Sequence, residues 1–211
     1  QKTGWFMLHR IRLAMETGSF LKAPGDAEAD ETFIGGLARN MHKDQRKRKI
    51  TGTGGAGKEV VMGVLRRGTD TEHNKVKAKH VRDTSRETLH AEIKVAVEPG
   101  SRLFTDAHAA YLGLGADYVH EAVDHAIEYV RGAVHTNGME NFWSLFKRAI
   151  KGTYVSIEPF HLDAYVVEET FRFNERKDND GGRFRKVLSN VKGKRVTYKE
   201  LTGNGTIAAA T

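Results

Sequence analysis

The sequence predicts an α/β domain built on a mixed sheet that is flanked by helices. Strand-like segments dominate the first half of the chain, with one helix among them. Apolar residues recur at helical spacing in the second half. The length of 211 residues suffices for one well-buried domain with additional arms or a tail.

The chain begins with a predicted helix over Trp5–Met15, where apolar and basic residues recur at helical spacing. A plain surface helix explains this pattern equally well. A Pro-Gly pair within Lys22–Asp30 interrupts helical periodicity, and Glu31–Gly36 then has the composition of a short strand ending in a glycine turn. Asp30 therefore lies at the first strand, which is a common place for a catalytic carboxylate.

A strongly basic segment follows at Arg39–Lys49, where Asp44 is the single acid, and a glycine-rich stretch follows at Gly52–Gly57. A solvated flexible loop is one interpretation. In a chain of this overall charge we favour contact with phosphate groups. The lysine of Gly54–Lys58 is not part of a Walker-type phosphate loop, because the leading spacing and the following hydroxyl are both missing.

The next segments predict a hairpin and a helix. Val60–Leu65 and Val76–Val81 have strand composition and flank a turn at Thr69–Asn74, so an antiparallel pair is expected. Thr84–Val97 carries apolar residues at helical spacing, and either of its first two residues would cap it.

A short buried strand at Arg102–Thr105 follows, with Asp106 at its end, and Tyr118–Ala122 is a further extended segment. Two helices, Asn137–Lys151 and Phe160–Asn174, complete the clear elements. This order resembles a mixed sheet of the ribonuclease H kind, although propensity alone ranks several α/β folds similarly.

The charge of the chain points to a polyanionic partner. The formal net charge is +7, with basic residues spread along the chain, which favours nucleic acid first and an anionic membrane surface second. No apolar run approaches the roughly 18 residues of a spanning helix, and we expect a cytoplasmic, nucleoid-associated protein. With no cysteine present, a metal ion would need oxygen or imidazole ligands.

Three acids on separate elements suggest phosphoryl transfer assisted by two Mg²⁺ or Mn²⁺ ions, which needs converging carboxylates and metals about 4 Å apart. They are Asp30, Asp106 and Glu140. In a sheet of this kind the first and fourth strands are neighbours, and the late helix packs beside them. Singly, each acid has a structural alternative: Asp30 as a solvated strand end and Asp106 as the cap of a short helix.

The helix that starts at Asn137 is the most informative segment. Its apolar stripe comprises Met139, Phe142, Trp143, Phe146 and Ile150, and its opposite side carries Glu140, Ser144, Lys147 and Lys151. Glu140 could hold a metal ion while Lys147 and Arg148 reach a phosphate. A capping box from Asn137 to Glu140 explains the glutamate equally well. His135 is a metal ligand, a phosphate contact or, more often for a lone histidine, a polar packing residue.

Several motifs in collinear order resemble one family of proteins. They are the residues of 30–36 (DETFIGG), 104–111 (FTDAHAAY), 135–148 (HTNGMENFWSLFKR), 152–154 (GTY) and 171–176 (FRFNER). Together they closely resemble the ISXO-like DDE transposases of the fifteen-ninety-five group of bacterial insertion sequences, which are related to the eukaryotic Merlin elements.

The resemblance implies a ribonuclease-H-like catalytic domain that cleaves transposon ends and joins them to target DNA. It implies Asp30 and Asp106 as the first two metal ligands and Glu140 as the third, followed by Lys147. Some members carry asparagine in the third position, so Asn137 and Asn141 stay open as alternatives. The side chains expected to contact DNA are Arg46, Lys47, Arg48, Lys49, His135, Asn137, Asn141, Lys147, Arg148 and Lys151.

The same resemblance suggests how the chain is organised. Residues 1–20 are expected to be the remnant of a helix-turn-helix whose preceding part is missing, residues 26–176 the catalytic domain, and residues 177–211 a basic tail after a linker at Asp178–Gly182. A homodimer acting on paired DNA ends is expected. Two rival functions stay open: a domesticated transposase that binds DNA without cutting it, and a nuclease without strand transfer.

Overall fold

The computed structural model describes residues 1–18, 20, 22, 24–36, 42–44, 55, 57–123, 134–155 and 157–203. The chain divides into two compact units, residues 20–155 and residues 1–19 together with 156–211. The predicted basic residues Arg46, Lys47, Arg48 and Lys49 lie outside the described residues.

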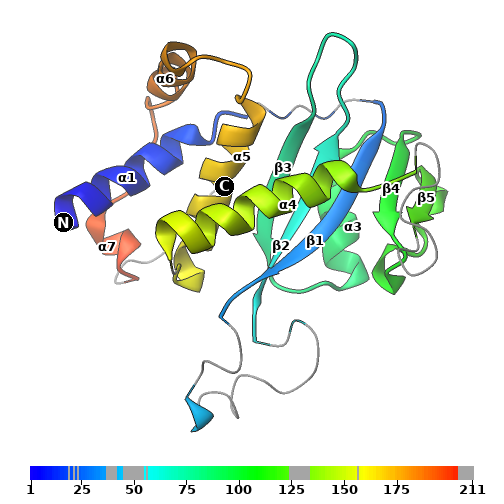
Figure 1. The fold of residues 1–211 in the computed structure, drawn as a ribbon, viewed down its shortest axis with the longest axis horizontal. Coiled ribbons are helices and arrows are strands. Elements are labelled where there is room, and N and C mark those ends of the chain that lie inside the picture. The colour runs from blue at the N-terminus through cyan, green and yellow to red at the C-terminus, as the bar shows by residue number, and fades with distance from the viewer. Residues whose placement is uncertain are drawn as a thin grey trace. The chain divides into compact units, whose positions relative to one another are not determined.

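The unit of residues 20–155 contains a five-stranded sheet in the order β3-β2-β1-β4-β5 (Figure 1). The strands are β1 (Ala27–Ile34), β2 (Glu59–Arg66), β3 (Lys75–Val81), β4 (Arg102–Asp106) and β5 (Val119–Val123). β1, β2 and β3 form an antiparallel meander, and β4 runs parallel to both β1 and β5. This mixed sheet with flanking helices confirms the expected ribonuclease-H-like fold class and the neighbouring first and fourth strands.

Helices cover both faces of the sheet (Figure 1). On one face lies α3 (Arg86–Ala96), whose Leu89 and Ile93 are buried in a cluster with Ala29 and Met62. On the other face lies α4 (Asn137–Ala149), which ends in a π-helical turn, η4 (Ile150–Tyr154). Two 3-10 turns, η2 (Ala109–Tyr111) and η3 (Leu114–Ala116), connect β4 to β5.

The alternation of side chains along β1 explains why this polar strand lies in the middle of the sheet. Ala27 and Ala29 belong to the apolar cluster on the α3 side, whereas Glu28 and Asp30 hydrogen-bond to groups of α4. Successive residues of a strand face opposite sides of the sheet. The small alanine side chains therefore let α3 pack closely on one face of β1, and Glu28 and Asp30 contact α4 on the other face.

Several predicted elements are confirmed. β2 and β3 form the expected hairpin, Ser85 caps α3 by accepting a hydrogen bond from the Thr88 amide, and the apolar stripe of α4 is buried. β1 begins at Ala27, earlier than predicted, so Asp30 lies within the strand. α4 keeps its regular form only to Ala149, because the last turn widens.

The unit of residues 1–19 and 156–211 is helical. It contains α1 (Lys2–Met15), a 3-10 turn η5 (Pro159–His161), α5 (Leu162–Asn174), α6 (Asp180–Ser189) and α7 (Tyr198–Leu201). Arg12 of α1 forms a buried ion pair with Glu168 of α5 at 2.8 Å, and Asn190 donates to the carbonyl oxygens of Ala14 and Glu16. The residues after α5 are thus held by α1.

The predicted linker at Asp178–Gly182 is wrong. Asn179 caps α6, accepting a hydrogen bond from the Gly182 amide at 2.8 Å, and the helix begins at Asp180. A polar residue followed by two glycines is typical of a linker, but here the asparagine provides the acceptor that a helix start requires. None of the described helices has the length and apolar content that crossing a bilayer requires.

Candidate active site

Asp30 and Asp106 lie on adjacent parallel strands. The register of β1 and β4 pairs Glu28 with Phe104, and both aspartates come two residues further along their strands. Side chains two residues apart share a face of the sheet. The two acids therefore occupy the same face, on the side of α4, with Asp30 in the middle of β1 and Asp106 at the carboxyl end of β4.

The surroundings of Asp30 raise its pKa from 3.8 to about 7. Burial contributes most, followed by the negative charges of Glu31 and Asp106. Two hydrogen bonds act in the opposite direction: the Glu31 amide donates to Asp30 Oδ1 at 2.9 Å, and the indole Nε1 of Trp143 donates to Asp30 Oδ2 at 3.0 Å. Asp30 is thus a partly buried carboxyl group close to two other acids, and it lies within β1 and not at a solvated strand end.

Glu31 adds a third acid that the sequence interpretation did not include. Burial raises its pKa, and its carboxylate accepts a hydrogen bond from the Tyr111 hydroxyl. His108 Nδ1 lies 4.0 Å from Glu31 Oε1. The alternation of β1 directs Glu31 to the α3 side, opposite Asp30, which is why Tyr111 reaches it. We refer to Asp30, Glu31 and Asp106 as the acidic cluster.

Asp106 also hydrogen-bonds to the backbone that follows β4. Its Oδ1 accepts a hydrogen bond from the His108 amide at 3.1 Å, and His108 is the residue that caps the 3-10 turn η2. The cap of the short helix is therefore His108 and not Asp106, which instead accepts a hydrogen bond from the amide of the capping residue. This hydrogen bond does not conflict with a site role, because a carboxylate has acceptor capacity on two oxygens.

Glu140 lies exposed in the first turn of α4. The capping box from Asn137 to Glu140 is wrong, because the residue that caps α4 is Thr136 and Asn137 is already helical. At about 100° per residue, Glu140 lies about 60° around the helix from Trp143, which contacts Asp30, whereas Asn137 and Asn141 lie about 120° and 160° away. Of the three proposed ligands on α4, Glu140 is directed closest to the acidic cluster.

The structure does not bring all three predicted ligands together. Across the described part of the chain, no three His, Cys, Asp or Glu side chains are close enough to hold one metal ion between them. Asp106 is close enough to Asp30 for its charge to raise the pKa of Asp30. Their oxygen donors have the chemistry that Mg²⁺ and Mn²⁺ prefer.

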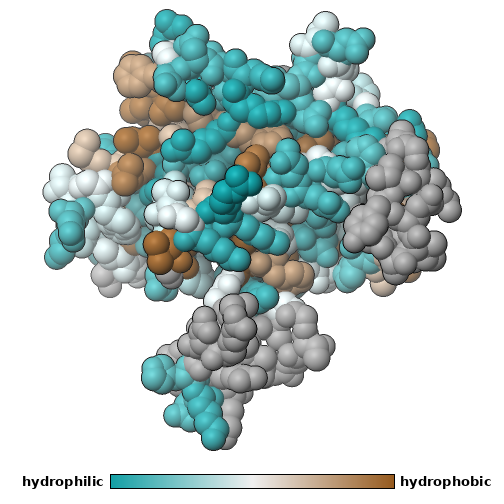
Figure 2. Space-filling view, in the orientation of Figure 1, coloured by the Kyte–Doolittle hydropathy of each residue, from teal (hydrophilic) through white to brown (hydrophobic). Residues whose placement is uncertain are grey.

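The basic residues predicted to contact DNA lie exposed at the carboxyl-terminal half of α4 and in η4. They are Lys147, Arg148 and Lys151. Lys147 lies only about 20° around the helix from Glu140, two turns further on. Hydrophilic side chains predominate over α4 on the face drawn in Figure 2. Cations and a carboxylate thus share one exposed side of this helix.

His135 lies in a polar network at the start of α4. Arg67 Nη2 lies 3.0 Å from His135 Nδ1 and donates to the His135 carbonyl oxygen at 2.6 Å. The imidazole is therefore held by an arginine, which agrees with the alternative of a polar packing residue. Arg67 and its partner Glu28 were not among the residues that the sequence singled out.

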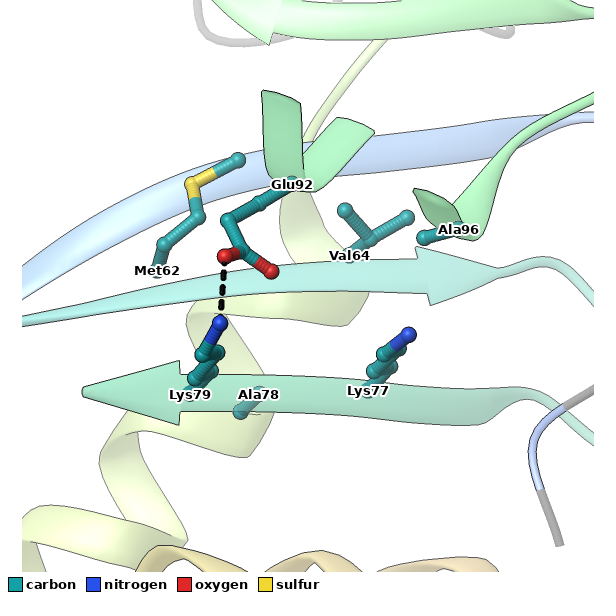
Figure 3. A pocket seen from close by; sticks show the side chains of 7 residues that line it. All are labelled: Met62, Val64, Lys77, Ala78, Lys79, Glu92 and Ala96. Carbon is teal, nitrogen blue, oxygen red and sulfur yellow. Dashed lines mark hydrogen bonds and ion pairs between the residues drawn. The ribbon is translucent and has the colours of Figure 1, made fainter. Parts of the chain in front are cut away.

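A small recess on the opposite face of the sheet offers no comparable chemistry. It lies between α3 and β3 and is lined by Met62, Val64, Lys77, Ala78, Lys79, Glu92 and Ala96 (Figure 3). Lys79 Nζ donates to Glu92 Oε1 at 2.7 Å, so these opposite charges satisfy each other. The acids on the α4 side of the sheet form the stronger candidate site.

Comparison with known proteins matches residues 22–174 to the ISXO2-like transposase domain. The chain belongs to this transposase family. The matched range of the transposase domain includes Asp30, Asp106 and Glu140 with the whole sheet, and the family implies DNA as the partner. A search of curated proteins finds no match.

Proposed function

We propose that this chain is the catalytic part of a transposase that cleaves DNA at transposon ends and joins the freed ends to target DNA. The observation that carries the proposal is the pair of aspartates on one face of adjacent parallel strands, where burial and the charges of Glu31 and Asp106 raise the pKa of Asp30. Carboxyl groups with strongly shifted pKa values are found most often in catalytic and binding sites.

The proposed reaction has two steps, hydrolysis at the transposon end and transfer of the freed end to target DNA. In the first, a water oxygen bonds to the phosphorus at the transposon end, the bond from phosphorus to the 3′ oxygen breaks, and that oxygen takes a proton. In the second, the freed 3′ oxygen bonds to a phosphorus of the target strand and gives up its proton. The 3′ oxygen of the target strand is then the leaving group.

The residues that would hold two Mg²⁺ or Mn²⁺ ions are Asp30, Asp106 and Glu140. Such ions, when bound, supply positive charge that stabilises the attacking and leaving oxygens. Asp30 is oriented for this role by the Trp143 indole and the Glu31 amide, which each hydrogen-bond one of its oxygens. Glu140 would close the site from the first turn of α4, where its side chain is exposed.

Lys147, Arg148 and Lys151 would bind phosphates on either side of the cleaved bond, together with the basic residues Arg46–Lys49 and with His135, Asn137 and Asn141. The net charge of +7 supports binding to a polyanion, and such binding weakens as salt concentration rises. By analogy with enzymes that process paired ends, we propose that the chain acts as a homodimer.

The test uses labelled duplex DNA that carries the ends of the element encoding the chain, incubated with Mg²⁺. Parent protein, Asp106→Asn and Glu140→Gln are compared, and nicked and joined products are resolved on denaturing gels. We expect both products from the parent only, because each variant removes a carboxylate from the proposed site. DNA binding by Asp106→Asn should equal or exceed that of the parent, since a negative charge near phosphate is lost.

Asp70→Asn is the matched control, because Asp70 is an exposed aspartate in the turn between β2 and β3. It should cleave and join as the parent does. Nicked product without joined product would identify a nuclease, and binding without any product would identify a DNA-binding protein. Cleavage by Glu140→Gln would show that Glu140 is not the third metal ligand and would favour Asn137 or Asn141 in that role.

A further inference from the structure

Glu28 is a carboxylate that the proposed chemistry does not use, although it lies on the same face of β1 as Asp30. Only 1% of its surface is exposed. Its Oε1 accepts a hydrogen bond from Arg67 Nε at 2.7 Å and lies 3.6 Å from His135 Nδ1. Its Oε2 accepts a hydrogen bond from the Met139 amide at 2.9 Å. Both carboxylate oxygens therefore have defined partners.

The contact with Met139 replaces a helix cap. The first turn of a helix has backbone N–H groups without partners in the helix, and the side chain of the capping residue usually accepts from one of them. Thr136, which occupies that position in α4, makes no such side-chain bond. Glu28 of β1 supplies the acceptor instead. The start of α4 is thus fixed by a strand of the sheet.

The close approach of helix and strand depends on Gly138. A Cβ atom at this position would lie 2.8 Å from Glu28 Oε2 and 3.0 Å from Leu65 Cδ1. Any side chain here would push the helix away from the carboxylate. Gly138 therefore supports the same contact independently of the hydrogen bonds.

Arg67 compensates the buried charge of Glu28. Its guanidinium lies 4.1 Å from the centroid of the Phe104 ring and donates to the His135 carbonyl oxygen. A buried ion pair adds little net stability compared with apolar packing, but it can hold a specific arrangement. Arg67 thus connects Phe104 of β4, His135 just before the cap of α4, and Glu28 of β1.

We propose that Glu28 is a positioning residue, which holds α4 in register on β1 and so places Glu140 relative to Asp30 and Asp106. α4 donates two hydrogen bonds to β1, from the Met139 amide to Glu28 and from the Trp143 indole to Asp30, one helical turn apart. Two such contacts fix both the rotation and the translation of a helix. The catalytic meaning of this placement rests on the proposed function.

The first test follows the indole resonance of Trp143 by NMR, without DNA or metal. The chain has only two tryptophans, and Trp5 of α1 serves as an internal reference. In Glu28→Ala we expect the Trp143 indole N–H signal to move while the Trp5 signal stays. Glu28→Gln, which keeps an acceptor for the Met139 amide, should move the Trp143 signal less.

Gly138→Ala tests the same contact without removing any charge, and it should move the Trp143 signal as Glu28→Ala does. Glu92→Ala is the control, because it removes an ion pair on the opposite face of the sheet. An unmoved Trp143 signal in folded Glu28→Ala or in Gly138→Ala would overturn the positioning role. If Glu28→Ala does not fold, the Trp143 signal of Gly138→Ala alone tests the positioning role.

The second test measures single-turnover cleavage and DNA binding separately. Displacement of a reacting group by about 1 Å can lower a rate by about 100-fold, so we expect a loss of this size in Glu28→Ala and Gly138→Ala, larger than the accompanying change in DNA affinity. Glu28→Gln should restore part of the rate. A parent that does not cleave would contradict the proposed function, and the NMR result would still decide the role of Glu28.

Discussion

Asp30 is under opposing influences that can be separated by substitution. Burial, Glu31 and Asp106 favour its protonated form, whereas the Trp143 indole and the Glu31 amide favour the carboxylate. The resulting pKa of about 7 places the change of charge at neutral pH. Each neighbour should therefore shift the pKa of Asp30 in a direction that its charge or hydrogen bond determines.

Asp106→Asn should lower the pKa of Asp30, because it removes a negative charge that favours the protonated form. Trp143→Phe should raise it, because the donor to Asp30 Oδ2 is lost. Carboxyl ¹³C chemical shifts followed through a pH titration measure both changes. Shifts in the same direction for the two variants would contradict this account of the acidic cluster.

At the residue level, the sequence places Asp30 and Asp106 on two strands, and the structure has them on the same face of β1 and β4. Prediction failed where a partner comes from far along the chain. Glu28 and Arg67 were missed, since they are 39 residues apart and only the β1–β2 pairing brings them together. The two-residue spacing of Glu28 and Asp30 in one strand was a signal that could have been used.

At the level of elements, the packing of α4 depends on a glycine of β2. Gly63 pairs with Asp30 across the sheet, and a Cβ atom there would lie 2.8 Å from Trp143 Cζ2 and would also overlap the end of Met139. The absence of a side chain makes room for the two α4 residues that lie over β1 and β2.

Gly63→Ala should lower the free energy of unfolding by about 1–3 kcal/mol, the usual effect of overpacking a core. The added methyl group must displace Trp143 or Met139, and Trp143 would then move away from Asp30. Gly115→Ala is the control, since a Cβ atom at Gly115 meets nothing within 4 Å. Urea unfolding measures the free energy of unfolding of both variants. Equal values would show that α4 can shift to accommodate the added methyl group at no cost in stability.

The helices differ in how far the sequence could predict them. The buried stripe of α4 is a strong periodic signal, and the structure confirms it. α6 also carries apolar residues at helical spacing, at Phe184, Val187 and Leu188. Phe184 and Leu188 are exposed, however, and Gly182 is the one buried residue of this helix. The polar and glycine residues at its start, from Asn179 to Gly182, resemble a linker. The five strands were all anticipated, because β-branched and apolar runs bounded by turn residues are typical of strands.

At the level of the whole molecule, the two compact units contain buried groups that respond to pH with opposite sign. In the unit of residues 20–155, Asp30 has a pKa raised from 3.8 to about 7. It therefore contributes stability at low pH that is lost as the pH rises through this range. In the unit of residues 1–19 and 156–211, the pKa of His9 is lowered from 6.5 to about 4.

His9 should make its unit less stable as the pH falls from about 6.5 toward 4, because the unfolded chain then takes up a proton that folded His9 does not. Burial is the main cause, followed by the positive charges of Arg12 and His161, while Glu168 acts in the opposite direction. His9→Phe keeps a ring beside Trp5, whose centroid lies 4.6 Å from that of His9. Thermal unfolding at pH 5 and pH 7.5 should show a smaller pH effect in this variant. An equal effect in parent and variant would assign the acid sensitivity to other groups.

The edge strand β3 affects whether copies of the protein can aggregate through their sheets. β3 lies at one edge of the described sheet and carries Lys75, Lys77 and Lys79 at every second position. An edge strand offers unpaired backbone groups to any passing chain, and lysines along it are a common means of preventing such pairing. Because like charges would face each other, this edge resists growth of the sheet from one molecule into the next. The protein should therefore remain free of fibrous aggregates formed through β3, even when it is crowded together on DNA.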